Sequence, residues 1–177
     1  MTGLNIGCGN DIRSGYINLD KVALPGVDVV WDVSQFPYPF ENNYFTTILL
    51  INVLEHIPDT IKVMEELHRI CKPGATITIR VPYWNSTQQA TDITHVRCFT
   101  EFSMDYFDPQ KPLGERRMYY STARFTVEAV HVWVCFPHRC YLIKNEPLCK
   151  ILLKIAHYLS NIASLIEFEL IALKPHP

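Results

Sequence analysis

The feature that most constrains this fold is a short apolar run that ends in a glycine turn. The run Leu4 to Ile6 is closed by Gly7 and Gly9, and a second strand-like run, Tyr16 to Leu19, ends at Asp20. A glycine after a strand lets the backbone approach a ligand because no Cβ obstructs it. In a doubly wound sheet, an acid that ends the next strand lies beside that turn and can accept both hydroxyls of a ribose. The stretch therefore predicts a site for a nucleoside-like ligand.

Strand-like and helical patterns alternate along the first half of the chain. Val27 to Trp31 and Thr46 to Ile51 are rich in β-branched and apolar residues, as buried parallel strands are. Apolar residues recur at helical spacing from Asp59 to Cys71, and Ala75 to Val81 reads as a further strand. This alternation predicts an α/β domain with a parallel sheet.

The second half of the chain begins with a long insertion. Residues 83–122 are polar and aromatic, and we expect them to lie over the substrate side of the sheet, because long loops in compact domains are usually functional. Residues 124–136 and 166–173 read as strands, and 147–162 between them has a helical pattern.

The predicted helix at 147–162 is amphipathic. Its apolar face carries Ile151, Ile155, Leu159 and Ile162. Its polar face carries Lys150, Lys154, His157 and Asn161. We expect the apolar face to pack on the sheet; a dimer face or a helix on a membrane surface is the alternative.

Composition narrows the class of protein. The 177 residues fit one domain, and 48% apolar content, 19% charged content and a net charge of −2 describe an ordinary globular protein. The basic residues form no stripe, which disfavours nucleic acid as a partner. No signal peptide or apolar run of about 18–20 residues is visible, so we expect a cytoplasmic protein without a transmembrane segment. The six cysteines lack zinc-ligand spacing and are expected to be reduced, mostly buried thiols.

The glycine turn suits a sulfonium ligand better than a dinucleotide. A dinucleotide site needs a third glycine where Ile12 stands and an acid about 20 residues beyond the first glycine, whereas Asp20 comes thirteen residues after Gly7. A positively charged sulfonium has no pyrophosphate to hold and does not need the third glycine. A nicotinamide dehydrogenase is therefore disfavoured.

Five motifs in order resemble the type-11 group of class I methyltransferases that depend on S-adenosylmethionine (SAM). The motifs are Leu4–Gly9, Asn18–Asp20, Trp31–Val33 with Phe36–Phe40, Asn52–Ile57 and Cys71–Gly74. The final run, Phe168–Lys174, is similar to the closing strand of that fold. The resemblance implies a doubly wound, Rossmann-like α/β sheet in three layers, mostly parallel with an antiparallel C-terminal strand. It also implies a single methyltransferase domain over residues 1–177.

The chain departs from that family pattern in three places. Asn5 stands where the first strand usually carries an acid, and Thr46 stands where an acid often precedes the fourth strand. Cys8 to Gly15 is shorter than a parallel crossover normally needs, so the helix there is expected to be reduced or lost. Three residues precede the first strand where the family has helices. We therefore expect cover over the cofactor from residues 83–122 or from a second subunit, as in a homodimer.

The resemblance implies that SAM is the cofactor and that a small molecule accepts the methyl group, with a hydroxyl of a sugar, glycan precursor or natural product as the expected acceptor. The cofactor-binding residues that it implies are Asn5, Gly7, Cys8, Gly9, Asp20, Lys21, Asp32, Val33, Asn52, Val53 and His56. The alternative function is a protein or partner subunit that binds SAM without methylating.

A neutral hydroxyl acceptor needs a base near the methyl group. The catalytic candidates are His95, Asp92 and His56, because histidine titrates near neutral pH and His56 follows the fourth strand. His56 could instead only pack or form a hydrogen bond, and Asp92, His95 and Arg97 could brace their loop to the sheet. No third or fourth ligand for a metal is evident beside Asp92 and His95, so no metal is predicted.

Three residues are candidates for contact with the substrate. Tyr83 and Trp84 follow the fifth strand, where either could line a pocket or fill the core. Arg97 could bind an anionic group, or it could pair with a carboxylate of the protein.

Overall fold

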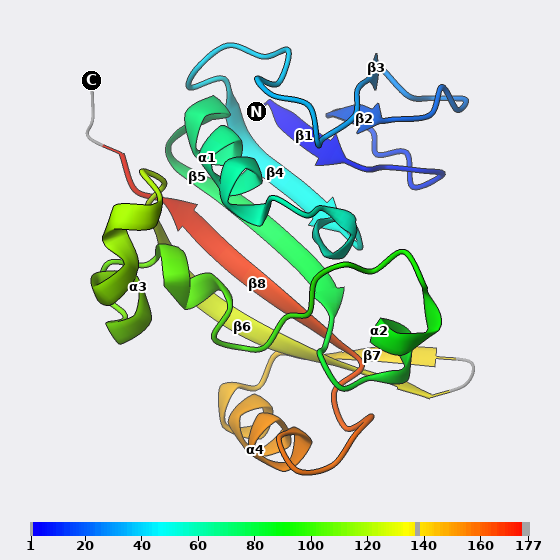
Figure 1. Ribbon diagram of the computed structural model, residues 1–177. Coiled ribbons are helices and arrows are strands. Elements are labelled where there is room, and N and C mark those ends of the chain that lie inside the picture. The colour runs from blue at the N-terminus through cyan, green and yellow to red at the C-terminus, as the bar shows by residue number, and fades with distance from the viewer. Residues whose placement is uncertain (1, 137–138, 175–177) are drawn as a thin grey trace.

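The computed structural model describes residues 2–136 and 139–174 of the chain (Figure 1). Within these ranges, eight strands form one sheet in the order β3-β2-β1-β4-β5-β8-β6-β7. The strands are β1 Gly3–Ile6, β2 Tyr16–Asp20, β3 Val29–Val30, β4 Phe45–Ile51, β5 Cys71–Pro82, β6 Phe125–Phe136, β7 Arg139–Ile143 and β8 Leu165–Ala172. The α-helices are α1 Thr60–Ile70, α2 Thr87–Thr91, α3 Pro112–Arg117 and α4 Glu146–Ala156. The 3₁₀ helices are η1 Leu54–His56, η2 Met104–Phe107 and η3 Met118–Tyr120.

The sheet is mixed, with its parallel part at the N-terminal half of the chain. β3, β2, β1, β4 and β5 pair in parallel, whereas β8 is antiparallel to both β5 and β6. β7 adds an antiparallel edge strand beside β6. The predicted α/β class and the antiparallel C-terminal strand are therefore confirmed. β1 and β2 are joined without a helix, as the short connection indicated.

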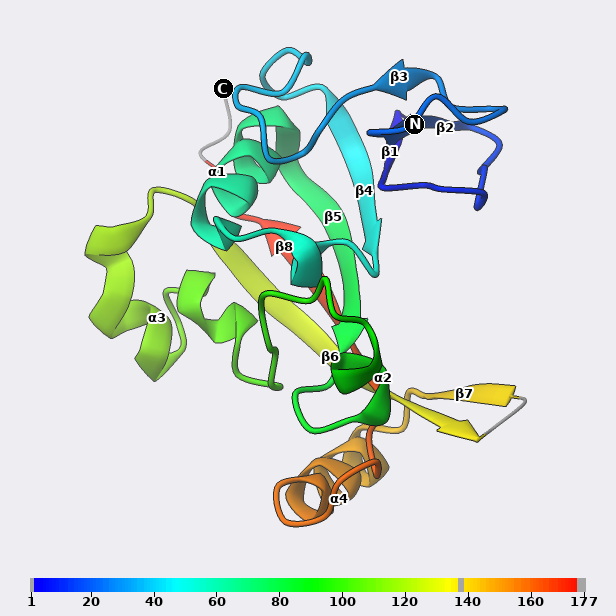
Figure 2. The ribbon, with the colours of Figure 1, turned by 45° about the vertical axis from the view of Figure 1, so that its right-hand side comes forward.

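The hydrophobic core lies on one face of the sheet. Alternate residues of the central strands, such as Ile48, Ile77, Ile79 and Phe168, belong to one buried cluster. The buried residues of α1, including Val63, join the same cluster. Figure 1 shows α1 and α3 in front of the sheet, and in Figure 2 both lie to one side of it.

The opposite face of the sheet is polar, and the expected third layer is missing over the described residues. Thr76 is exposed, while Thr78 and Arg80 on the same face of β5 are half-buried. Nε of Arg80 lies 3.3 Å from a carboxylate oxygen of Glu167, and its guanidinium lies 4.3 Å from the ring centre of Trp133. The physical reason is the length of the β1–β2 and β2–β3 connections, which are too short to carry helices across this face.

The helix α4 packs with a different face from the predicted one. Its buried residues are Cys149, Leu153 and Ala156, whereas Ile151 and Ile155 are exposed. Two of the three buried side chains are small, and Sγ of Cys149 lies 2.9 Å from the carbonyl oxygen of Ile143. Close approach to the end of β7 therefore selects the small-residue face. Contact of the exposed apolar face with a second subunit or with a membrane surface stays a prediction.

Residues 83–122 fold into short helices rather than an open loop. The segment contains α2, η2, α3 and η3. Met104 and Phe107 of η2 belong to the buried cluster, so the middle of this segment packs on the covered face of the sheet.

The cysteines differ from the expectation of six reduced thiols. Cys135 and Cys140 stand opposite each other in the paired strands β6 and β7, and they form a disulfide across this hairpin. Cys8, Cys71 and Cys149 are buried free thiols, and Cys98 is an exposed one.

None of the helices within residues 2–136 and 139–174 has the length and apolar character that crossing a membrane requires.

Candidate functional site

A cleft of about 410 Å³ lies at the carboxyl ends of β1, β2 and β4. Ligands of open α/β sheets bind at this edge. This cleft is the first cavity. Eight of the residues predicted to bind the cofactor line it, namely Gly7, Asp20, Lys21, Asp32, Val33, Asn52, Val53 and His56. Its other walls are Leu19, Trp31, Ser34, Ile57 and Thr94.

The acid at the end of β2 closes onto the glycine turn after β1. The main-chain N–H of Gly9 donates to Oδ2 of Asp20 at 2.8 Å, and the N–H of Val22 donates to Oδ1 at 3.0 Å. Each carboxylate oxygen keeps a lone pair for a further donor. Asp20 therefore stands fixed at the mouth of the turn, with room to accept hydroxyls of a ligand.

Gly7 is required by both its conformation and its neighbour. Its φ angle is +63°, in the left-handed region that side chains disfavour. A Cβ built on Gly7 would meet a methyl group of Val53, Cγ2. Val53 follows β4, so the turn after β1 and the end of β4 form one wall of the first cavity.

Three predicted residues lie outside the lining of the first cavity: Gly9, which binds Asp20, and Asn5 and Cys8. Nδ2 of Asn5 donates to the carbonyl oxygen of Asp11 at 2.7 Å and to Oδ1 of Asn18 at 3.1 Å. The N–H of Cys8 donates to the carbonyl oxygen of Leu19 at 3.0 Å, and burial raises the pKa of its thiol. Both residues brace the short β1–β2 connection, which explains why a neutral amide can replace the family's usual acid.

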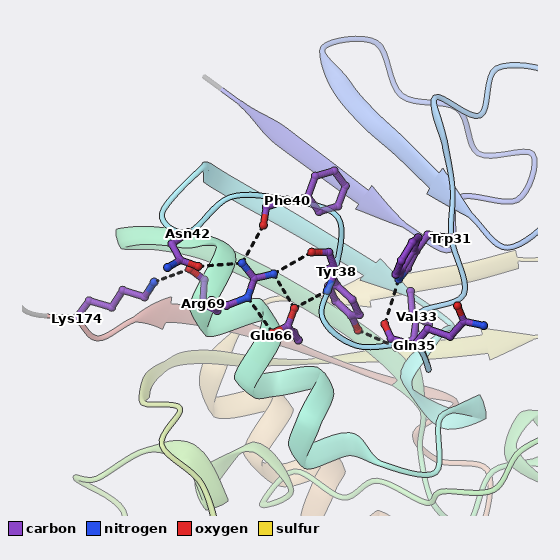
Figure 3. Close-up of polar contacts among 9 residues, drawn as sticks. All are labelled: Trp31, Val33, Gln35, Tyr38, Phe40, Asn42, Glu66, Arg69 and Lys174. Atoms are coloured by element: carbon purple, nitrogen blue, oxygen red, sulfur yellow. Dashed lines mark hydrogen bonds and ion pairs between the residues drawn. The ribbon is translucent and has the colours of Figure 1, made fainter.

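The segment after β3 is held against α1 by one arginine (Figure 3). Arg69 donates to both carboxylate oxygens of Glu66, at 2.8 and 2.7 Å, and to the carbonyl oxygens of Tyr38 and Phe40. The hydroxyl of Tyr38 donates to the carbonyl oxygen of Val33 at 3.0 Å. These contacts fix Val33, and with it the neighbouring Asp32, at the wall of the first cavity.

A polar cluster separates the first cavity from a second one. His56 and His95 lie with their ring centres 4.7 Å apart. Nδ1 of His56 lies 2.9 Å from Oγ1 of Thr94, and that hydroxyl donates to Oδ1 of Asp92 at 2.7 Å. The hydroxyl and N–H of Thr94 lower the pKa of Asp92, which keeps its carboxylate ionised. All three predicted catalytic residues therefore meet in one cluster.

Glu55 completes this cluster, and sequence reasoning missed it. Its side chain is 0% exposed, and neither carboxylate oxygen has a hydrogen-bond partner among the described residues. Burial raises the pKa of Glu55 to about 7. Oε1 of Glu55 lies 4.0 Å from Nε2 of His95. Its position just after strand β4 and next to His56 was visible in the sequence. The burial of its side chain was not, because burial depends on residues that are distant along the chain.

The second cavity has a volume of about 360 Å³. It is lined by Asn52, Glu55, His56, Pro82, Thr87, Gln88, Thr91, Asp92, His95 and Leu165. His56 and Asn52 line both cavities, so the two cavities adjoin at these residues.

The three predicted substrate contacts lie elsewhere. Tyr83 is 0% exposed in the core, where its hydroxyl donates to Glu101 at 3.0 Å, so it fills the core and lines neither cavity. Trp84 is 42% exposed and also lines neither cavity. Arg97 donates through Nε and Nη2 to the carbonyl oxygen of Pro58, and it borders a separate groove of about 600 Å³. Arg97 thus braces its loop rather than pairing with a carboxylate.

The residues of the first cavity suit a nucleoside-type cofactor. An acid beside a glycine turn fits ribose hydroxyls, and the apolar walls at Leu19, Trp31 and Val53 fit a planar ring. A second acid, Asp32, stands on the same lining.

Comparison with known proteins agrees with this geometry. Residues 1–125 match the family described as methyltransferase domain. No curated protein matches the chain.

Solved structures share the fold at low sequence identity. A SAM-dependent methyltransferase from Archaeoglobus fulgidus is 15% identical, with a TM-score of 0.60, over 96% of this chain and 85% of that one. A Thermotoga maritima protein described as a SAM-dependent methyltransferase and possible histamine N-methyltransferase is 14% identical, with a TM-score of 0.63, over 98% and 82%. A complex that contains the Haloferax volcanii Trm112 methyltransferase activator matches at 12% identity, with a TM-score of 0.59, over 99% and 83%. The family match covers well over half of the chain, and the cleft offers the groups that a nucleoside cofactor needs. The chain therefore belongs to the methyltransferase domain family, and it shares its fold with the SAM-dependent enzymes above.

Proposed function

We propose that this enzyme methylates a hydroxyl group of a polar small molecule, with a sugar or glycan precursor as the expected class. The observation that carries the proposal is the position of His56, whose side chain lines both the first and the second cavity. An acceptor in the second cavity would meet the cofactor at this residue.

The cofactor would lie in the first cavity. Asp20 would accept the ribose hydroxyls, and Asp32 with Val33 would hold the adenine. Gly7, Asn52 and Val53 form the wall that the rest of the cofactor would follow. Lys21 borders the same cleft. Bound SAM supplies a methyl group on a sulfonium, and its transfer forms an oxygen–carbon bond, breaks the sulfur–carbon bond and leaves S-adenosylhomocysteine.

His56 is suited to take the proton of the acceptor hydroxyl. Because the hydroxyl hydrogen of Thr94 is directed to Asp92, Thr94 can only accept at Oγ1 from Nδ1–H of His56. Nε2 of the neutral ring then carries a lone pair, and among the described residues it has no hydrogen-bond partner. The chain from His56 through Thr94 to the ionised Asp92 would stabilise the imidazolium that forms.

The second cavity has the side chains that a polyhydroxylated acceptor needs. Thr87, Gln88 and Thr91 offer hydroxyl and amide groups, while Pro82 and Leu165 offer apolar surface. Sugars combine both kinds of surface, which supports this acceptor class over a purely apolar one. The cytoplasmic location and the homodimer expected from the sequence stay predictions.

The test is turnover with methyl-labelled SAM and a panel of glycosides, natural-product alcohols and amines. We expect a labelled methyl ether from at least one hydroxyl acceptor. We also expect His56→Gln to lower kcat by about 10²-fold or more, with SAM affinity measured separately by calorimetry. Labelled products from amines alone would overturn the hydroxyl assignment. SAM binding without any product would favour a protein that binds SAM without methylating.

A further inference from the structure

We propose that Glu55, His56 and His95 form a binding site for one divalent transition-metal ion, located between the two cavities. One ligand atom from each of the three residues lies within 4.8 Å of the other two. The residues come from two segments about forty positions apart, so the fold, not a local motif, brings them together. The sequence predicted no metal beside Asp92 and His95, because the other two ligands, Glu55 and His56, lie far from them along the chain.

The first support is the buried carboxylate. Both oxygens of Glu55 are buried without a hydrogen-bond partner among the described residues, and the side chain is 0% exposed. A buried carboxylate without a partner is costly, whereas one that binds a cation is compensated. Among the residues that the structure describes, the nearest cationic candidate is Nε2 of His95, which stands 4.0 Å away, beyond hydrogen-bond distance.

The second support is the orientation of both imidazoles. Nδ1 of His95 lies 3.0 Å from the carbonyl oxygen of Gln89, which can only accept, so Nδ1 carries the hydrogen and Nε2 a lone pair. Nδ1 of His56 donates to Thr94 in the same way, which leaves its Nε2 with a lone pair. Histidines that bind metals are fixed by such hydrogen bonds from their other ring nitrogen.

The donor types select the class of ion. A tetrahedral ion with bonds of about 2.0 Å holds its ligand atoms about 3.3 Å apart, so Oε1 of Glu55 and Nε2 of His95, now 4.0 Å apart, would move together by less than 1 Å on binding. Two imidazoles and one carboxylate suit Zn²⁺, Fe²⁺, Co²⁺ or Mn²⁺ and leave positions open for another ligand. Mg²⁺ and Ca²⁺ prefer oxygen ligands and are not expected to bind here.

The location of the site gives the ion a role in activating the acceptor. This role rests on the proposed function, but the binding of the ion does not depend on that function. Glu55, His56 and His95 all line the second cavity, so an open position on the ion would face the acceptor. A bound cation polarises a hydroxyl and lowers its pKa. The lone pair of Nε2 of His56 would then bind the ion, so the ion would replace His56 in activating the hydroxyl.

The experiment is calorimetric titration of the purified, metal-stripped protein with Zn²⁺, and with Mg²⁺ for comparison. All proteins would carry Cys98→Ser, because the exposed thiol could bind zinc by itself. We expect one Zn²⁺ per chain and no Mg²⁺ binding. Glu55→Gln and His95→Gln should each weaken Zn²⁺ binding by about tenfold or more. His131→Gln is the matched control. His131 lies outside the cluster, where its Nε2 is 3.2 Å from Oε1 of Glu169, so the His131→Gln variant should bind Zn²⁺ as the parent does.

A Co²⁺ absorption spectrum gives the second readout. The parent should show visible ligand-field bands that are lost in His95→Gln, with thermal unfolding confirming that the variant is folded. Failure of the folded parent to bind Zn²⁺, or equal binding by the parent and both cluster variants, would overturn the site. Calorimetry with SAM separates this result from the proposed function. SAM binding and methyl transfer in metal-free protein would leave the hydroxyl proposal standing and would overturn the catalytic role of the ion, whereas the Zn²⁺ titration alone decides whether the site exists.

Discussion

Oδ2 of Asp20 lies 2.8 Å from the main-chain nitrogen of Gly9, so the acid that ends β2 is held on the glycine turn that follows β1. This contact orients the carboxylate before any ligand arrives. Because no reorganisation of Asp20 is needed, its bonds to ribose hydroxyls would contribute nearly their full value to cofactor affinity.

Replacing Asp20 should therefore weaken cofactor binding. We expect Asp20→Ala to raise the Kd for SAM by about tenfold or more, in line with about 1.5–3 kcal/mol for hydrogen bonds to a charged group. Asp11→Ala is the control, because Asp11 is an exposed carboxylate on the same connection that pairs with Arg13. Calorimetric titration measures both, and an unchanged Kd in Asp20→Ala would remove Asp20 from the ribose role.

The contact between Gly7 and Val53 predicts a stability defect that can be partly relieved. Gly7→Ala combines a left-handed φ of +63° with a collision against Val53, so we expect a loss of about 2 kcal/mol or more. Gly15→Ala has a φ of +80° and open space around its Cβ, so it should lose only about 1–2 kcal/mol. Urea denaturation compares them. Adding Val53→Ala should recover part of the Gly7→Ala loss, and no recovery would argue against the collision.

Much of the first cavity could be predicted from the sequence because its residues sit at the ends of strands. Gly7, Asp20 and Asn52 each follow or end a run whose pattern marks a strand, and parallel strands bring their carboxyl ends to one edge. The missing helix between β1 and β2 was also visible as a short connection. Strand ends are local features, and one sequence carries them directly.

Burial and long-range packing account for what the sequence did not reveal. Glu55 has no partner within its own motif, and its cluster depends on His95 from a distant loop. The face on which α4 packs was misassigned because small residues such as Ala156 give no strong apolar signal. The polar face of the sheet had a visible cue, the alternation of Thr76, Thr78 and Arg80 along β5, which is typical of a strand with one solvated side.

The network around Arg69 predicts a coupling between α1 and the first cavity. Arg69→Met removes both bonds to Glu66 and those to the carbonyl oxygens of Tyr38 and Phe40. Because the two charged side chains are 27% and 13% exposed, we expect a loss of about 1.5–3 kcal/mol rather than that of a fully buried pair. Urea denaturation at neutral pH measures it.

The same variant should also affect the cofactor site. Since the segment from Trp31 to Phe40 carries Asp32 and Val33 to the cavity wall, SAM affinity should fall together with stability. Lys62→Met is the control, because its pair with Asp59 is exposed and lies on the same helix at the other end. Arg69→Met with unchanged stability and unchanged SAM affinity would show that the segment is held by its apolar contacts alone.

Because His68 is half-buried, we expect the free energy of unfolding to decrease in mild acid. Burial lowers the pKa of His68 below 6.5, although the bond between Nε2 and the carbonyl oxygen of Leu173, at 2.9 Å, opposes the shift. As the pH falls, the unfolded chain therefore binds a proton on His68 before the folded chain does. The contribution of the neutral His68 to stability is complete above pH 6.5 and decreases as the pH falls towards the pKa of His68 in the folded protein. Urea denaturation at about pH 7.5 and about pH 5 should show a larger decrease for the parent than for His68→Gln, which cannot titrate. Glu65→Gln keeps His68 and serves as the helix control. Equal decreases in the parent and His68→Gln would show that other groups cause the acid sensitivity.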